Sequence, residues 1–227
     1  MLNVYIGYDS REDIAYRVCR DSILNHASIP IRVIPLKQHK LRESGLYTRS
    51  LDPFASTEFS LTRFLVPRLN DYKGWAVFVD CDFLFRHDIY QVMDYAEEKM
   101  AVSCVKHNYM PTETTKMDGA VQHLYPRKNW SSFMLFNCEH PHTRSLSPSI
   151  VNVSNPSFLH QMQWTDDESI GSLPISFNYL EGWYKKSDCI DPIGVHFTRG
   201  GPWFEQWKDV EYADEWNAAR EELEKYE

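Results

Sequence analysis

The first 36 residues are the feature that most constrains the fold of this chain. An apolar run at residues 3–8 (NVYIGY) predicts a buried strand, and a second run at 29–36 (IPIRVIPL) predicts another. Between them, apolar residues recur at helical spacing through residues 9–27, and Asp9 or Ser10 stands where a helix cap is expected. A strand, a helix and a strand in this order favour a parallel sheet with right-handed crossovers. We therefore expect an α/β protein.

The rest of the chain continues to alternate between the two kinds of element. Further strands are expected at 75–80, 100–105, 131–137 and 193–197. Further helices are expected at 57–72, 88–98, 155–164 and 211–227. The 227 residues contain no internal repeat and no linker-like segment, so one domain spanning residues 1–227 is the expected organisation.

Composition excludes several classes of function. The formal charge is −8 and there is no block of Lys and Arg, so nucleic acid is not an expected partner. No apolar run approaches the roughly 20 residues that a membrane helix needs, and residues 1–13 do not resemble a signal peptide. The five cysteines are odd in number, widely spaced and in apolar surroundings, which predicts reduced thiols and a cytoplasmic location.

The segment at 77–85 (VFVDCDFLF) sets two carboxylates into an apolar strand. Side chains alternate along a strand, so Asp80 and Asp82 are expected on one side and Cys81 on the other. Two neighbouring carboxylates repel each other unless a cation lies between them, and oxygen ligands suit Mg²⁺ or Mn²⁺. Ligands of α/β sheets bind beyond the carboxyl ends of strands, where this pair lies. The alternative is a solvated turn with two ordinary aspartates.

A second candidate segment is GVHFTRGGPW at 194–203. His196 follows an apolar strand and is a candidate third metal ligand. The backbone at Gly200 and Gly201 could approach phosphate oxygens closely, and Arg199 could supply positive charge. The alternative is a histidine at the edge of the core, followed by a tight turn.

Two further candidates are an arginine and a pair of acids. Arg63 lies on the predicted helix before the Asp-x-Asp strand, from which it could reach a carboxylate or a phosphate. Asp166 and Asp167 follow an aromatic helix end, where one of them could point into a cleft. The alternatives are a surface arginine and a solvated helix cap.

In chain order, six segments resemble the retaining glycosyltransferases of family eight and their relatives, which have the GT-A fold. The segments are YIGYDSREDIAY, LTRFLVPRL, VFVDCDFLF, WSSFMLFN, TDDESI and HFTRGGPW. The resemblance runs from residue 4 to residue 203. It implies a Rossmann-like GT-A domain with a mixed, mostly parallel central sheet flanked by helices.

The resemblance also implies roles for individual residues. Asp80, Asp82 and His196 would hold Mn²⁺, or Mg²⁺, on the diphosphate of a UDP-sugar. The residues implied to hold uridine are Tyr8, Asp9 and Arg11. Arg63 would steady Asp80 or the donor sugar, and the residues implied near the sugar or ribose are Ser131 and Ser132. Those implied near the anomeric carbon are Asp166 and Asp167.

The chain departs from the family pattern at four positions. Trp130 and Ser132 replace an asparagine and a glycine, and Asp167 replaces the glutamine at the reaction centre. Gly201 replaces the lysine that contacts the diphosphate in the family, and Arg199 could supply that charge instead. These changes affect the donor sugar and the stereochemistry more than the fold.

The expected function is therefore a metal-dependent hexosyltransferase. It would move a hexose from UDP-glucose or UDP-galactose to a sugar or glycan acceptor with retention, with Asp167 stabilising the cationic sugar. One alternative is an inverting GT-A transferase, and another is a metal-free carbohydrate-binding module. A haloacid-dehalogenase-like phosphatase would use Asp80 and Asp82. Its motif belongs on a first strand and before small residues, whereas here residues 83–85 are Phe-Leu-Phe on a third strand.

Overall fold

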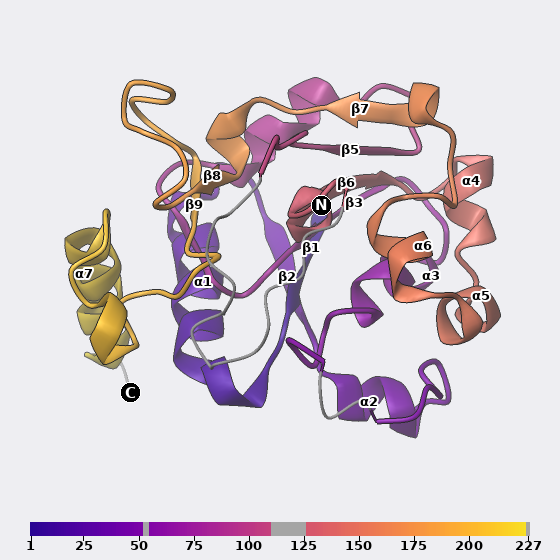
Figure 1. The fold of residues 1–227 in the computed structure, drawn as a ribbon, viewed down its shortest axis with the longest axis horizontal. Helices are drawn as coiled ribbons and strands as arrows, with labels where there is room; N and C mark the ends of the chain where they lie inside the picture. Colours follow the sequence, from indigo (N-terminus) through magenta and orange to yellow (C-terminus); the bar gives the residue numbers. More distant parts are fainter. Residues whose placement is uncertain (52–54, 110–125, 226–227) are drawn as a thin grey trace.

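A mixed sheet forms the centre of the structure, a computed structural model that describes residues 1–51, 55–109 and 126–225 (Figure 1). Within these residues, six strands pair in the order β2-β1-β3-β6-β5-β7. Their bounds are β1 Leu2–Gly7, β2 Ile31–Leu36, β3 Trp75–Val79, β5 Val102–Cys104, β6 Phe133–Asn137 and β7 Ile170–Ser172. Only β6 runs antiparallel to its neighbours in this sheet. The predicted mixed, mostly parallel sheet is confirmed.

A second, smaller sheet lies beside the first. In the described part of the chain it has three strands in the order β4-β9-β8. Their bounds are β4 Phe83–Phe85, β8 Tyr179–Leu180 and β9 Gly194–His196. The chain leaves the large sheet after Val79 and joins the small sheet at Phe83. Residues 80–82 therefore connect two sheets, and the prediction that Asp80 and Asp82 lie within one strand is wrong. Their carboxylates are placed by the course of this connection and not by strand alternation.

Helices flank the sheets. The α-helices are α1 Asp13–His26, α2 Gln38–Glu43, α3 Val66–Leu69, α4 Pro141–Ser145, α5 Pro148–Val153, α6 Pro156–His160 and α7 Ala213–Glu224. The 3₁₀ helices are η1 Ser10–Glu12, η2 Thr62–Leu65, η3 Ile89–Tyr95, η4 Trp130–Ser132, η5 Asp167–Ser169, η6 Ile175–Phe177 and η7 Glu205–Trp207. Helix α1 packs against β4 and against α7, which lies beside it at the edge of the molecule (Figure 1). The predicted opening strand, helix and strand is confirmed.

Several predicted helices are shorter than expected. The segment 57–72 contains η2 and the short α3, because Pro67 has no N–H and occupies the first turn of a new helix. The segment 88–98 forms only the 3₁₀ helix η3. Helix α6 begins after the expected cap Asn155 but ends at His160, and Met162 then adopts a left-handed φ of +55°. Of the helix expected at 211–227, residues 213–224 form α7, and residues 226–227 lie outside the described part of the chain.

Aromatic packing fills the junction between the two sheets. The ring of Phe83 stacks on His196 with a centroid distance of 4.4 Å, and it lies 6.3 Å from the ring of Phe133. Phe133 in turn packs 5.9 Å from Phe177. All three phenylalanines are buried. Tight packing of this kind restricts rotamers, so the backbone around residues 80–82 and 196 has a rigid support.

Across the residues that the structure describes, no helix is both long enough and apolar enough to span a bilayer.

Candidate metal centre

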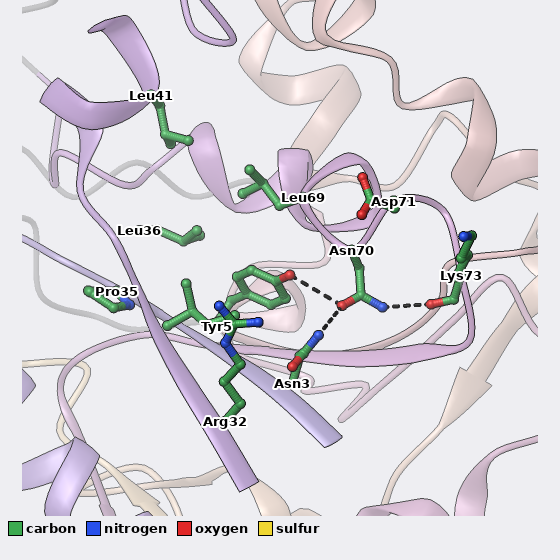
Figure 2. A pocket seen from close by; sticks show the side chains of 11 residues that line it. Asn3, Tyr5, Arg32, Pro35, Leu36, Leu41, Leu69, Asn70, Asp71 and Lys73 are labelled. Carbon is green, nitrogen blue, oxygen red and sulfur yellow. Dashed lines mark hydrogen bonds between the residues drawn. The ribbon is translucent and has the colours of Figure 1, made fainter. Parts of the chain in front are cut away.

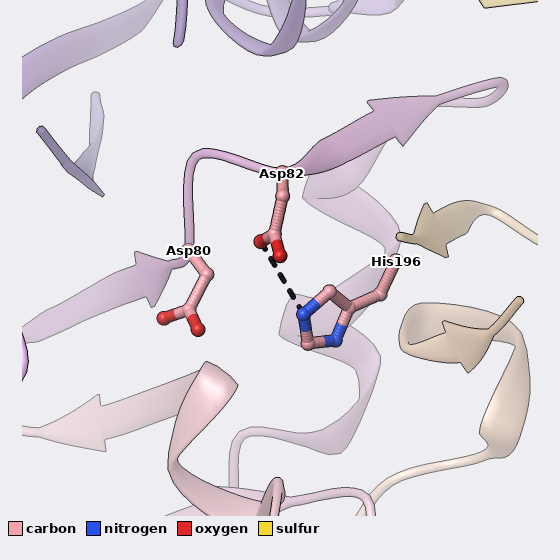
Figure 3. A group of neighbouring side chains, drawn as sticks. All are labelled: Asp80, Asp82 and His196. Atoms are coloured by element: carbon pink, nitrogen blue, oxygen red, sulfur yellow. Dashed lines mark ion pairs between the residues drawn. The ribbon is translucent and has the colours of Figure 1, made fainter. Parts of the chain in front are cut away.

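Three predicted ligands meet where the small sheet joins the large one (Figure 3). One ligand atom from each of Asp80, Asp82 and His196 lies within 4.8 Å of the others. Antiparallel pairing of β4 with β9 sets His196 opposite Phe83, the residue that follows Asp82. Asp82 Oδ1 lies 3.3 Å from His196 Nε2. Residues far apart in sequence thus form one cluster.

Arg63 supports this cluster from the helix before β3. Its Nη1 lies 2.7 Å from Asp80 Oδ1 and donates to the carbonyl oxygen of Ser131 across 2.8 Å. The arginine is 5% exposed, so the alternative of a surface arginine is wrong. A guanidinium fixed by two partners holds the Asp80 carboxylate in one orientation.

Ser131 and Ser132 form part of the same scaffold. The carbonyl oxygen of Ser132 accepts from the backbone N–H of Asp80 at 2.9 Å, and the Ser131 hydroxyl lies 2.9 Å from His160 Nδ1. Both serines are buried, and both belong to η4 and not to the predicted strand. Their backbone oxygens therefore bond the chain's own groups beside the carboxylates.

Asn178 was not predicted, although it links Ser132 to His196. Its Nδ2 donates to Ser132 Oγ at 2.9 Å, and its Oδ1 lies 3.0 Å from His196 Nδ1. Its side chain is completely buried. No local pattern marks it, because its segment (ISFNYL) has neither a motif nor a distinctive spacing.

Glu12 is a second buried residue near the cluster that the sequence did not predict. Glu12 in η1 is 7% exposed, and the Cys81 thiol donates to its Oε2 across 3.5 Å. Burial, and then the charge of Asp82, raise the pKa of the Glu12 carboxyl to about 8. Burial also raises the pKa of Asp82, but the neighbouring His196 outweighs it, so this pKa lies below its usual range.

The residues of the cluster fit a divalent cation. Asp82 Oδ1 is buried and, within the described residues, has no hydrogen-bond partner; it lies 3.3 Å from His196 Nε2. A buried carboxylate oxygen in this state is costly unless a cation approaches it. Two carboxylates and one imidazole form a ligand set that suits Mn²⁺ or Mg²⁺.

The three residues expected to hold a nucleotide base lie together around the start of α1. The carboxylate of Asp9 is fully buried and accepts from Arg11 N, Nε and Nη2 at 2.9, 3.0 and 2.7 Å. It also accepts from Glu58 N at 3.1 Å. Burial raises the pKa of Asp9, but these hydrogen bonds outweigh it and the pKa is lowered. Tyr8 donates to Asp13 Oδ1 at 2.8 Å, and Lys37 lies over its ring.

Arg199 is held by a buried acid. Its Nη2 donates to Glu181 Oε2 at 3.3 Å, and its guanidinium lies over the ring of Trp207. The space beside Gly182 is filled by this guanidinium, so a Cβ there would overlap it. Gly200 adopts a φ of +135°, which favours glycine. Arg199 therefore fixes the turn after His196 through its contacts with Glu181, Trp207 and Gly182.

Asp166 and Asp167 make separate contacts. Asp166 Oδ1 accepts from the Ser169 N–H at 2.7 Å and so caps η5, as the helix-cap alternative had it. Asp167 Oδ1 pairs with Arg127 Nη2 at 2.6 Å, and the Arg127 guanidinium lies over Trp130. Within the described residues, neither acid belongs to the three-residue cluster.

His107 is a further residue that the sequence analysis missed. It is 5% exposed, its Nδ1 lies 2.8 Å from the Tyr184 hydroxyl, and its carbonyl oxygen accepts from Trp130 Nε1. Burial, and then the nearby His196, lower the pKa of His107 to about 3. The imidazole is therefore neutral at physiological pH.

A pocket of about 490 Å³ lies away from this cluster, against β1 and β2 (Figure 2). Asn3, near the amino end of β1, donates to Asn70 Oδ1 at 2.7 Å, and the Tyr5 hydroxyl donates to the same oxygen at 3.2 Å. Asp80 follows the carboxyl end of β3. Because β3 runs parallel to β1, Asp80 lies at the opposite edge of the sheet from Asn3. The pocket is thus separate from the candidate metal centre.

Comparison with solved structures identifies the fold. The bifunctional glycosyltransferase WbbM in its apo form matches with a TM-score of 0.70 at 16% identity, over 99% of this chain and 51% of that chain. GlyE of Streptococcus pneumoniae TIGR4 matches with a TM-score of 0.62 at 12% identity, over 96% of this chain and 60% of that chain. The galactosyltransferase LgtC, in complex with donor and acceptor sugar analogues, matches with a TM-score of 0.60 at 10% identity. The match covers 98% of this chain and 96% of that chain.

The chain thus spans about half the length of WbbM and 60% of GlyE. The predicted GT-A fold is confirmed by these matches. The haloacid-dehalogenase alternative finds no support in them.

Sequence comparison gives a nearer relative. No protein-family profile matches the chain. Protein CDI of Arabidopsis thaliana is 53% identical over 225 residues, which cover 98% of this chain and 87% of that protein. The chain therefore belongs to the same family as Protein CDI.

Proposed function

We propose that this chain is a metal-dependent glycosyltransferase that moves a hexose from UDP-glucose or UDP-galactose to a hydroxyl of a sugar or glycan. The observation that carries the proposal is the cluster of Asp80, Asp82 and His196, which follows the carboxyl end of a central strand on a GT-A fold. The solved structures with this fold support it, since WbbM and GlyE are named glycosyltransferases and LgtC a galactosyltransferase.

Asp80, Asp82 and His196 would hold Mn²⁺ or Mg²⁺ at this position. When bound, the ion supplies Lewis-acid stabilisation of the negative charge that develops on the leaving diphosphate. Arg63 orients Asp80 through its ion pair, and the stacked ring of Phe83 orients His196. These contacts preorganise the ligands, so little reorganisation is needed when a donor binds.

The other predicted residues complete the proposed donor site. Uridine would lie against Tyr8, Asp9 and Arg11 at the start of α1. The diphosphate would lie near the turn of Arg199, Gly200 and Gly201. The sugar or ribose would approach Ser131 and Ser132, with Asp166 and Asp167 near the anomeric carbon. We propose that all of these belong to one GT-A domain over residues 1–227, related to family eight.

The proposed reaction is a substitution at the anomeric carbon. The bond from this carbon to the diphosphate oxygen breaks, and UDP leaves with the electron pair. The acceptor hydroxyl oxygen forms the new bond on the same face, and its proton passes to the leaving phosphate. Asp167 would stabilise the positive charge on the sugar. An inverting transferase is the alternative, in which the acceptor attacks the opposite face.

The five cysteines support a reducing location. All of them are free thiols, and four are completely buried: Cys19, Cys81, Cys104 and Cys138. We propose that the protein works in the cytoplasm, where such thiols stay reduced.

A calorimetric titration tests the proposed donor site. UDP is titrated into the protein with Mn²⁺, then with EDTA, and the titration is repeated on Asp82→Asn. The exposed Asp209→Asn is the matched control, since it makes the same chemical change away from the cluster. Binding that requires both Mn²⁺ and Asp82, and that survives in the control, supports the proposal and justifies a screen of UDP-sugars for transfer.

Two results would count against the proposal. UDP binding that is unaffected by EDTA would show that the site needs no metal. This result would favour a metal-free sugar-binding module. No binding of UDP in any condition would remove UDP as the donor, and GDP and other nucleotides would be tested next.

A further inference from the structure

We infer that Asn178 is a positioning residue that holds the hydrogen of the His196 tautomer on Nδ1 and thereby leaves Nε2 to face Asp82 and the cation site. This role deepens the proposed function and rests on it, because it concerns how one ligand of the proposed metal centre is held. It can still be tested without a metal, since a tautomer is a property of the protein alone.

Burial makes the direction of each hydrogen bond in this region decidable. Asn178 is 0% exposed, His196 2% and Ser132 3%. Bulk water does not reach these side chains, so the protein itself provides their hydrogen-bond partners. Each donor must then face an acceptor along the series of contacts that joins Asn129, Ser132, Asn178 and His196. This series is called the connection below.

The connection starts at the backbone of Asn129. Ser132 Oγ lies 2.7 Å from the carbonyl oxygen of Asn129, which can only accept, so the single hydroxyl hydrogen of Ser132 is donated there. Asn178 lies 2.9 Å from the same Oγ, which has no second hydrogen to give. Ser132 therefore accepts from Asn178, and the amide nitrogen of Asn178 faces Ser132.

The opposite amide orientation is disfavoured by the same contacts. It would place Asn178 Oδ1 against Ser132 Oγ, and the hydroxyl hydrogen could then serve only one of two acceptors. Either the 2.7 Å contact with Asn129 or the 2.9 Å contact with Asn178 would become a repulsive pair of oxygens. The serine thus decides the orientation of the amide.

The orientation of the amide then decides the tautomer of the histidine. Asn178 Oδ1 lies 3.0 Å from His196 Nδ1 and can only accept, so Nδ1 carries a hydrogen. Nε2 is then the nitrogen left to face Asp82 Oδ1, at 3.3 Å, and its lone pair becomes the one that a cation at this position can take. This is the protonation pattern that a metal-binding histidine needs.

Ser132 joins this connection to the other side of the cluster. Its carbonyl oxygen accepts from the Asp80 N–H at 2.9 Å, while its hydroxyl accepts from Asn178. One buried serine therefore holds the backbone of one ligand and, through Asn178, the ring of another. This arrangement accounts for a fully buried asparagine beside the cluster.

The first experiment reads the tautomer directly. Protein with ¹⁵N-labelled histidine is studied metal-free at pH 8.5 by two-bond ¹H–¹⁵N correlation NMR. The wild type is expected to show the Nδ1–H tautomer at His196, and Asn178→Leu is expected to show a mixture or the other form. The matched control is Asn137→Leu, which removes a buried asparagine of β6 that bonds Glu98 and Glu139. It should leave the His196 signals unchanged.

The second experiment measures Mn²⁺ affinity by calorimetry and electron paramagnetic resonance, with no nucleotide present. Asn178→Leu is expected to bind Mn²⁺ about 10- to 100-fold more weakly than the wild type. Asn178→Asp keeps the acceptor for Nδ1–H but places an oxygen against Ser132 Oγ, so it is expected to bind Mn²⁺ more tightly than Asn178→Leu and more weakly than the wild type. Unchanged tautomer and unchanged Mn²⁺ affinity in Asn178→Leu would overturn the role of Asn178. A wild type that binds no Mn²⁺ would instead overturn the metal centre, while the NMR result would still decide whether Asn178 sets the tautomer.

Discussion

Arg63 and Asp80 form a buried ion pair, 2.7 Å from Nη1 to Oδ1, and the guanidinium also lies over the rings of Phe59 and Phe78. The guanidinium therefore contacts two aromatic rings as well as the carboxylate. An arginine suits this place because its planar group can stack and donate at the same time. The pair connects the helical segment before β3 to the candidate metal centre.

Replacement of Arg63 by methionine should destabilise the fold, because it removes the buried guanidinium that pairs with the Asp80 carboxylate. We expect a loss of about 3 kcal/mol in the free energy of unfolding, measured with urea. Arg68→Met is the control, since its pair with Asp71 is largely exposed and should contribute at most about 1 kcal/mol. Equal losses in the two variants would show that the Arg63–Asp80 pair contributes no more to the free energy of unfolding than the exposed pair does.

Glu12 predicts a pH dependence of stability in the metal-free protein. Its pKa of about 8 lies above the ordinary value of 4.5, so between these values the folded state binds more protons than the unfolded state. Stability should therefore fall as pH rises from about 5 to 8 and change little from this group above that. Glu12→Gln removes this fall, and its advantage over wild type at pH 9 should be on the order of several kcal/mol.

The measurement is urea unfolding in EDTA at pH 5, 7 and 9, with the exposed Glu221→Gln as control. The advantage of Glu12→Gln should grow with pH, and the control should stay parallel to the wild type. A constant difference between Glu12→Gln and the wild type would show that Glu12 keeps an ordinary pKa.

The thiols should differ sharply in reactivity. Four cysteines are completely buried, and burial raises the pKa of each of their thiols, to about 12 for Cys104 and Cys138. Cys189 is only partly buried. Ellman's reagent should therefore titrate one thiol rapidly in the native protein and five in urea, and Cys189→Ser should abolish the rapid phase. Rapid reaction of a second thiol would mean that the structure around one of the buried cysteines opens readily.

Gly182 and Gly45 provide a matched pair of glycines. Both have a left-handed backbone, with φ of +70° and +73°, but only Gly182 has a neighbour, Arg199, where a Cβ would lie. Gly45→Ala should cost only the backbone strain, about 1 to 2 kcal/mol. Gly182→Ala should cost the same strain and also displace Arg199 from Glu181. With Mn²⁺ present, UDP binding should weaken about tenfold in Gly182→Ala, or about 1.4 kcal/mol, and stay unchanged in Gly45→Ala. Unchanged binding in both would remove Arg199 from the diphosphate site.

Asp167 should affect turnover and not donor binding. Asp167→Asn is expected to lower the rate of hexose transfer about 100-fold or more while keeping the affinity for UDP, because in the proposed reaction the charge of Asp167 acts on the sugar cation. The neighbouring exposed Glu168→Gln is the control. Arg127→Met must be measured beside them, since it removes the partner of Asp167. An equal loss in Arg127→Met would mean that the ion pair matters, and unaltered turnover in Asp167→Asn would exclude a catalytic role.

Local patterns predicted the parts of the fold that local forces decide. The β1-α1-β2 unit could be predicted because apolar periodicity differs between a helix and a strand. The connection at residues 80–82 could not, since an apolar run looks the same whether a strand continues or passes to a second sheet. The helix expected at 57–72 was overestimated, because the position of Pro67 at the start of a new turn depends on tertiary packing.

The candidate ligands were predictable for a similar reason. Asp80, Asp82 and His196 each follow or interrupt an apolar strand, so their polarity stands out in the sequence. Asn178, Glu12 and His107 have no such contrast with their neighbours, and their importance arises from contacts with distant residues. Supporting residues of this kind become visible only when the chain is folded.

The passage of the chain between two sheets also has a consequence for the order of folding. Asp80 and Asp82 can take their places once β3 has joined the large sheet, but His196 arrives only when β9 pairs with β4. A growing chain that has not yet reached β9 thus presents two carboxylates without their imidazole. The three candidate ligands are therefore brought together only when β9 has paired with β4 and the small sheet is closed.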